Sequence, residues 1–209
     1  MTVLLLIRHA ETDAVGNRIT GWLPGVSLTA RGQQQAIRLG ERLSGVPLRA
    51  VYASPLERAI HTAESAARPH NLQVRISEAV GEVRMGEWSG LSYRELDERP
   101  EWRRFNQVRS MTRIPGGELM VETQARMVGE LDRLRAAHPD EVFAVVSHGD
   151  VIKAAIAYFA GMPLDFLWRF EIDPASVSVI AFEGDTPRIL RLNDSEELRD
   201  LPLWNARPA

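Results

Sequence analysis

The chain of 209 residues contains no cysteine, which excludes disulfide bonds, thiolate metal ligands and a cysteine nucleophile. It also has no excess of positive charge. The formal net charge is −3, so we expect no nucleic-acid partner. No apolar run approaches the length of a membrane-spanning helix, and we expect no membrane partner.

The sequence also lacks the signs of a secretory leader or of a linker. The opening stretch MTVLLLI leads directly into Arg8, without a basic segment or a cleavage site. Together with the absence of cysteine, which suits a reducing compartment, this predicts a soluble cytoplasmic protein. No change in composition divides the chain, and 44% hydrophobic residues support a substantial core, so we expect residues 1–209 to form a single domain.

Short apolar runs alternate with helical patterns along the chain. VLLLI (3–7), RAVYAS (49–54) and VFAVVSHGD (142–150) indicate strands that are buried on both faces of a parallel sheet. Residues 72–80 are predicted to form a third strand in chain order, and 176–182 with 188–193 a terminal hairpin.

Helical periodicity lies between these runs. Thr29 is expected to cap the first helix, and Ser54 and Glu57 are expected to form a capping box around Pro55 at the start of the second. The remaining predicted helices are 93–108, 118–138, 149–161 and a short one at 163–170.

This alternation predicts an α/β fold, a three-layer sandwich with a mostly parallel central sheet flanked by helices. Ligands of such sheets bind beyond the carboxyl ends of the strands. Arg8 and His9 follow the first strand, Ser54 leads from the second towards Arg58, and His148 ends a later strand. If these strands are parallel neighbours, the side chains converge on one edge of the sheet.

Two arginines and two histidines in one place suit a phosphorylated substrate. The guanidinium group matches phosphate oxygens with a planar set of donors, and neutral imidazole is a nucleophile. Transfer of a phosphoryl group to histidine, stabilised by fixed cations, requires no metal ion or other cofactor. A metal hydrolase built on His9, Glu11 and His148 is the weaker alternative, because the helical histidine spacing of such sites is absent.

Five segments resemble the histidine phosphatase superfamily, in its phosphoglycerate-mutase-like branch. These segments are LIRHAET (6–12), ITGW (19–22), SPLERAIHTA (54–63), GEVRMGEWSG (81–90) and VVSHGDVI (145–152), so the resemblance covers most of the chain. Ala10 stands where the family usually has glycine.

The resemblance implies roles for eight residues. His9 would be the nucleophile, and three further side chains would hold the phosphoryl group: Arg8, Arg58 and His148. Glu82 would protonate the leaving group and then activate water. The positions of Thr20, Gly21 and Gly149 match those that line the family's substrate pocket.

A general acid must be partly protonated near neutrality, which requires burial or nearby negative charge. Met85 and Trp88 are candidates for an apolar wall around Glu82. Glu87 competes for the same role, although its distance from the following glycine and tryptophan fits the family pattern less well.

Several positions depart from the family pattern. Val15 stands where asparagine is common, and whether Asn17 replaces it is open, as is a contribution of Glu118 in PGGE to the pocket. Asp150 follows Gly149 where mutases usually have asparagine. Near the end, Glu197 replaces a histidine, which we expect to affect packing rather than chemistry.

The sequence therefore predicts a metal-independent phosphomonoester hydrolase that acts through a phosphohistidine on a small phosphorylated metabolite. The first alternative is a phosphoglycerate-type phosphomutase, against which the short middle region and Asp150 argue. The second is a non-catalytic phospholigand-binding protein of the same fold. A homodimer is the expected assembly on base rates. The identity of the substrate is open.

Overall fold

Six strands form one sheet in the order β3-β2-β4-β1-β5-β6 in a computed structural model that describes residues 1–195. The predicted packing role of Glu197 falls outside this range. The strands are β1 (Thr2–Arg8), β2 (Leu48–Ala53), β3 (Val74–Ile76), β4 (Val142–Ser147), β5 (Val177–Glu183) and β6 (Thr186–Asp194). The helices are α1 (Ala30–Leu43), α2 (Glu57–Ala67), α3 (Tyr93–Asp97), α4 (Pro100–Gln107), α5 (Met120–Ala137) and α6 (Gly149–Phe159).

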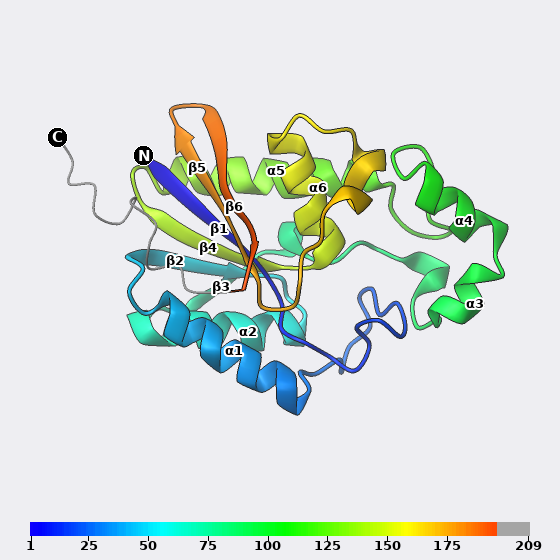
Figure 1. Cartoon of the computed structure of the whole chain (residues 1–209), viewed down its shortest axis with the longest axis horizontal. Coiled ribbons are helices and arrows are strands. Elements are labelled where there is room, and N and C mark those ends of the chain that lie inside the picture. The colour runs from blue at the N-terminus through cyan, green and yellow to red at the C-terminus, as the bar shows by residue number, and fades with distance from the viewer. Residues whose placement is uncertain (196–209) are drawn as a thin grey trace.

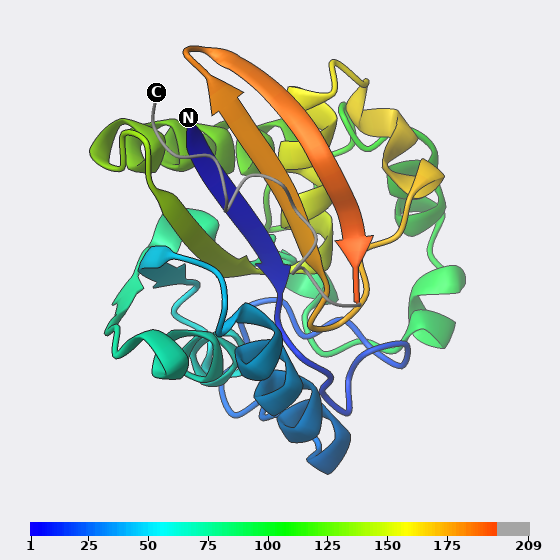
Figure 2. The same ribbon diagram turned by 60° about the vertical axis from the view of Figure 1, so that its left-hand side comes forward.

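The sheet is parallel except at one edge. Strand β4 lies between β1 and β2 and pairs in parallel with both, and β3 adds a further parallel strand beside β2. Strands β5 and β6 form the predicted hairpin, which joins the sheet antiparallel to β1 (Figure 2). The mostly parallel sheet and the terminal hairpin are thus confirmed.

Alternate residues of the buried strands pack into two separate cores. On β1, Leu5 and Ile7 face helices α1 and α2, whereas Leu4 and Leu6 face α5 and α6. Figure 1 shows these helix pairs on opposite sides of the sheet, with α3 and α4 beyond one end of it. Because both faces of the strands are covered, continuous apolar runs rather than alternating ones encode them. The predicted three-layer sandwich is confirmed.

The predicted capping box at the start of the second helix is wrong. Helix α2 begins at Glu57 after Leu56, without a side-chain cap. The hydroxyl of Ser54 instead lies 2.8 Å from Nε2 of His148, and the carboxylate of Glu57 accepts a hydrogen bond from the backbone N–H of Gly25. Both side chains are used in tertiary contacts, which outweigh the local capping preference. The predicted cap at Thr29 does form, through the N–H of Gly32.

Two further boundaries differ from the prediction. The strand expected over 72–80 is only β3, followed by a 3₁₀ turn at Glu78–Val80, because its single partner β2 ends at Ala53. The helix expected over 93–108 is divided into α3 and α4. Pro100 causes the division, since it disfavours helical backbone at the preceding Arg99, whose φ and ψ are −95° and 123°.

Within residues 1–195, no helix is long and apolar enough to cross a membrane. In the same range, no group of three or more histidine, aspartate or glutamate side chains is arranged to hold a metal ion.

Candidate active site

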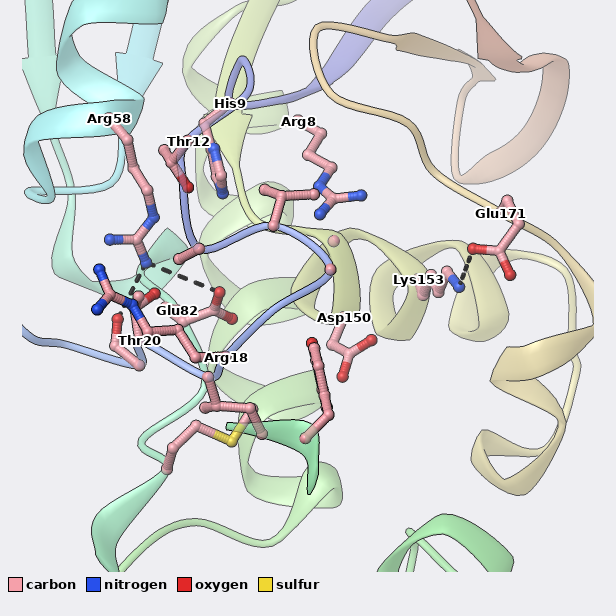
Figure 3. A pocket seen from close by; sticks show the side chains of 18 of the residues that line it. Arg8, His9, Thr12, Arg18, Thr20, Arg58, Glu82, Asp150, Lys153 and Glu171 are labelled. Carbon is pink, nitrogen blue, oxygen red and sulfur yellow. Dashed lines mark hydrogen bonds and ion pairs between the residues drawn. The ribbon is translucent and has the colours of Figure 1, made fainter. Parts of the chain in front are cut away.

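The carboxyl ends of three neighbouring parallel strands meet at one edge of the sheet. Arg8 ends β1 and His9 follows it, His148 follows β4, and Ser54 follows β2. Arg58 lies in the first turn of α2, four residues after Ser54. Figure 3 shows Arg8, His9 and Arg58 directed into one cavity, with Glu82 opposite them. The expected convergence at the edge of the sheet is observed.

His9 is buried and held in one orientation. Its Nδ1 donates to the carbonyl oxygen of Ala10 at 2.8 Å, so Nε2 carries the lone pair. Burial, followed by the charges of Arg58 and Arg8, lowers the pKa of His9 from 6.5 to about 3. Its imidazole is therefore neutral at physiological pH, the state in which it can act as a nucleophile.

Arg8 and Arg58 each keep a buried N–H group without a partner in the described part of the chain. Arg8 donates from Nη1 to the carbonyl oxygen of Ile172 at 2.5 Å, and its Nε is unpartnered. Arg58 is 1% exposed, donates from Nη2 to the carbonyl oxygen of Gly21 at 3.0 Å, and leaves Nη1 unpartnered. Buried donors without acceptors are costly unless a ligand satisfies them, so these groups mark an anion site.

His148 lies behind the cavity wall and is fully buried. Its ring centroid is 5.1 Å from that of His9, and its Nε2 is 2.8 Å from Oγ of Ser54. We assign the proton to Nδ1, because Oε2 of Glu82 lies 3.4 Å from it, and the Ser54 hydroxyl then donates to Nε2. Nδ1 makes no hydrogen bond within residues 1–195. Burial, with the charge of Arg58, lowers the pKa of His148 well below 6.5. His148 thus offers a neutral N–H donor near His9.

Glu82 lies in the cavity wall opposite His9. Its Oε2 is 3.4 Å from Nδ1 of His148 and 3.8 Å from Nη2 of Arg58, and its Oε1 accepts the N–H of Val83. Burial raises the pKa of Glu82 above 4.5, against the opposing effect of Arg58. The competing candidate, Glu87, is exposed and does not line the cavity.

A half-buried ion pair supports the loop that carries Glu82. Arg126 of α5 donates to the carbonyl oxygens of Ala79, Gly81 and Glu82, each at 2.8 Å. Its partner is Glu118, at 2.9 Å, which also accepts the N–H of Arg84. Glu118 therefore does not line the cavity but positions the loop from behind.

The cavity has a volume of about 260 Å³, the size of a small-metabolite site. All three positions predicted to line it, Thr20, Gly21 and Gly149, do so. At Gly21, where φ is +49°, a Cβ would lie 2.9 Å from Oγ of Ser89, so only glycine fits there. Val15 lines the cavity, whereas Asn17 points away from it and donates to the carbonyl oxygen of Asp13.

We call the part of the cavity lined by Arg8, His9, Arg58 and Glu82, with His148 behind them, the inner half. The outer half, which the sequence did not reveal, is formed by Arg18, Tyr93, Arg109, Asp150, Lys153, Trp168 and Glu171. Two signals could have pointed there: Asp150, which departs from the mutase pattern, and Lys153, which is the single lysine of the chain. The other residues come from loops and helices whose sequences carry no recognisable motif.

The outer half is held together by ion pairs and aromatic contacts. Nη1 of Arg109 lies 2.6 Å from Oδ2 of Asp150, and Nζ of Lys153 lies 2.9 Å from Oε2 of Glu171. The guanidinium of Arg109 stacks 4.2 Å from the ring of Trp168. Figure 3 shows Asp150, Lys153 and Glu171 on the side of the cavity away from Arg58.

Comparison with known proteins identifies the family of this site. The chain is 36% identical over 197 residues to phosphoserine phosphatase 1 of Hydrogenobacter thermophilus, covering 92% of both chains. It is 33% identical over 183 residues to the adenosylcobalamin/alpha-ribazole phosphatase of Escherichia coli, covering 85% of this chain and 88% of the relative.

A solved structure, that of Bacillus stearothermophilus YhfR, shares the fold. It matches with a TM-score of 0.88 and 32% identity, over 93% of this chain and 98% of that one. The sequence profile of the histidine phosphatase superfamily (branch 1) matches residues 4–195. These matches confirm the family and the phosphatase class predicted from the sequence: the chain belongs to the histidine phosphatase superfamily, branch 1.

Proposed function

We propose that the protein hydrolyses phosphomonoesters of small metabolites through a phosphohistidine intermediate, with His9 as the nucleophile. The observation that carries this proposal is the neutral, oriented imidazole of His9 beside the unpartnered N–H groups of Arg8 and Arg58. A neutral nucleophile beside cationic donors that can bind a phosphoryl group is what phosphoryl transfer requires.

In the first step, Nε2 of His9 attacks phosphorus and the bond to the leaving alkoxide breaks. Because Nδ1 donates to the carbonyl oxygen of Ala10, the lone pair of Nε2 points into the cavity throughout. The charge on the transferred phosphoryl oxygens is balanced by three donors, Arg8, Arg58 and the Nδ1–H of His148.

Glu82 supplies the proton that the leaving alkoxide needs. Its raised pKa favours the protonated carboxyl group, and the phosphate dianion raises the pKa further when it binds. In the second step the Glu82 carboxylate takes a proton from water, the water oxygen bonds to phosphorus, and the bond to His9 breaks. Phosphate leaves, and both His9 and Glu82 return to their starting states.

A phosphate-release assay with p-nitrophenyl phosphate and a metabolite panel tests this proposal, with a chelator present. We expect chelator-resistant turnover by the wild type and at least a 10⁴-fold loss in His9→Ala, on the order of other nucleophile deletions. His61→Ala is the matched control, because His61 is exposed on α2 away from the cavity. Absence of turnover by the wild type on every ester contradicts the proposal.

A second readout detects the intermediate itself. Rapid quenching with labelled substrate is expected to trap phosphate on His9 in a bond that is labile in acid and stable in base. A wild type that turns over substrate without such a species contradicts His9 as the nucleophile. Cytoplasmic location, homodimer formation and a single domain over residues 1–209 stay predictions.

A further inference from the structure

Every cation of the outer half is paired closely with a carboxylate, whereas in the inner half Arg58 reaches Glu82 only at 3.8 Å and Arg8 has no ion pair within residues 1–195. Arg109 is paired with Asp150 at 2.6 Å, and Lys153 with Glu171 at 2.9 Å. Arg18, at the rim, pairs with Asp13 at 3.0 Å. A second anionic group on a substrate would therefore have to displace a carboxylate from one of these pairs, at a cost in free energy.

Asp150 is fixed in position and presents an open acceptor. Only its Oδ2 bonds to Arg109, which is 2% exposed, while its Oδ1 has no hydrogen-bond partner within residues 1–195. Burial alone would raise the pKa of Asp150, but Arg109, with a smaller contribution from Lys153, outweighs burial and lowers the pKa below 3.8. Asp150 thus stays ionised down to acidic pH.

The position of Asp150 places its charge next to the phosphate site. The preceding residue, Gly149, packs so closely on Arg8 that a Cβ would lie 3.4 Å from the Arg8 guanidinium. Asp150 follows it in the first turn of α6 and lines the same cavity. A group only a few bonds from the bound phosphorus atom would therefore meet this carboxylate.

Given the proposed phosphatase activity, on which this inference rests, we propose that Asp150 selects the leaving group by accepting a hydrogen bond from its ammonium group. The substrate class is then phosphomonoesters of amino alcohols, in which an ammonium group stands close to the ester oxygen. The fixed carboxylate attracts that group and repels a second phosphate or carboxylate placed at the same point. Arg109 acts through Asp150 as a positioning residue.

The test compares O-phosphoserine with 3-phosphoglycerate, which differ only in an ammonium group where the second carries a hydroxyl. We expect wild-type kcat/KM to favour O-phosphoserine by at least 10-fold, on the order of one charged hydrogen bond. In Asp150→Asn, whose amide oxygen still accepts from Arg109, that preference is expected to fall by about 10- to 100-fold. Asp150→Glu, which retains the charge, is expected to retain part of the preference.

The control is Asp132→Asn, which removes an exposed carboxylate paired with Arg135 on α5, far from the cavity lining. It is expected to keep the wild-type preference. An Asp150→Asn enzyme that loses activity equally on both substrates overturns the inference, because Asp150 would then be structural. A wild type that hydrolyses p-nitrophenyl phosphate but does not prefer O-phosphoserine overturns it too, and leaves the proposed phosphatase activity intact. Failure on all esters contradicts both.

Discussion

Arg58 and Arg109 are both buried in the wall of one cavity, 1% and 2% exposed, and differ in what they contact. Arg109 meets a carboxylate at 2.6 Å and stacks on two aromatic rings, Phe105 and Trp168. Arg58 has only the carbonyl oxygen of Gly21 and, at 3.8 Å, Glu82, and its Nη1 has no partner in the described residues.

This difference separates binding of the phosphate from recognition of the rest of the substrate. Leaving a buried guanidinium donor unsatisfied costs free energy in the empty enzyme, which the phosphate recovers when it binds. Each cation of the outer half is paired with a carboxylate, although Nε of Arg109 also has no hydrogen-bond partner in the described residues. Because these charges are paired, the outer half adds little unspecific attraction for anions. It can therefore discriminate between leaving groups while the inner half retains the same chemistry.

After loss of the nucleophile His9, the largest effect is expected from the proton donor of the inner half. Glu82→Gln keeps the shape of the side chain but cannot donate, and turnover of alkyl phosphates should fall by about 10²- to 10⁴-fold. The p-nitrophenolate group leaves with little help from an acid, so p-nitrophenyl phosphate should lose much less. Steady-state kinetics on both ester types measure this, with Glu87→Gln as control. Equal losses on both esters would contradict the role of Glu82.

The same residue predicts a pH dependence. Glu82 must be protonated to donate, and burial raises its pKa above 4.5. The rate on alkyl phosphates should therefore fall as the pH rises above that raised pKa, whereas His9, with a pKa of about 3, should not limit the rate until far lower pH. Glu82→Gln should lack the basic limb of the profile.

Replacement of each buried arginine by methionine tests the difference between the two halves directly. Arg58→Met removes donors to the phosphoryl group, and kcat/KM should fall by about 10²- to 10³-fold for every ester, with weaker inhibition by inorganic phosphate. Arg109→Met leaves Asp150 without its partner, so stability and leaving-group preference should change more than phosphate inhibition. Inhibition constants and thermal unfolding of the two variants distinguish the effects. Similar phosphate inhibition constants would contradict the division of the pocket.

The inner half could be predicted from the sequence because its residues follow buried strands. An apolar strand that stops at Arg8 and His9, or at His148, indicates where the edge of the sheet lies. The same residues indicate the chemistry of the site at that edge. The outer half could not be predicted in this way. Arg109 and Trp168 reach the cavity from a loop and a 3₁₀ segment, and only tertiary packing brings them to Asp150.

The wrong capping box at Ser54 and Glu57 has a related cause. The sequence pattern of a cap is local, but in the fold the Ser54 hydroxyl is close to a buried histidine that has no other acceptor or donor for Nε2. The local preference of Ser54 for helix capping is thus outweighed by its contact with His148 in the site. Glu118 shows the converse: its motif resembled the family's, but only the contact with Arg126 reveals what it does.

A further difference between the halves is expected in acid stability. The pKa of His9 is about 3 in the folded protein and 6.5 in the unfolded chain, so the unfolded chain binds the proton more tightly. As the pH falls from 7 to 5, His9 therefore lowers the free energy of unfolding by about 2 kcal/mol. The raised pKa of Glu82 acts with the opposite sign. The lowered pKa of Asp150 contributes stability that is fully present between pH 7 and pH 5 and is lost only as the pH falls below 3.8. Urea unfolding of His9→Gln should show a flatter loss over that interval, with His61→Gln as control. An unchanged slope would contradict the buried neutral state of His9.

The smallest effect is expected from the support of the Glu82 loop. Arg126→Lys has three N–H donors in place of five and cannot bond to the three carbonyl oxygens and to Glu118 together. The loop should therefore loosen, and kcat on alkyl phosphates should fall by about 10-fold, as for other supporting contacts. Greater access of water to Glu82 should lower its pKa towards 4.5, which shifts the basic limb of the pH profile to lower pH.

Arg133→Lys is the matched control, because Arg133 lies on the same helix, is exposed and pairs only with Glu130. A merely structural role of Arg126 would reduce stability and move turnover of both ester types equally, without shifting the pH profile. A shift confined to alkyl phosphates would instead show that the inner half depends on a half-buried ion pair behind it. An arginine paired with a carboxylate then supports both halves: Arg126 with Glu118 holds the Glu82 loop, and Arg109 holds Asp150.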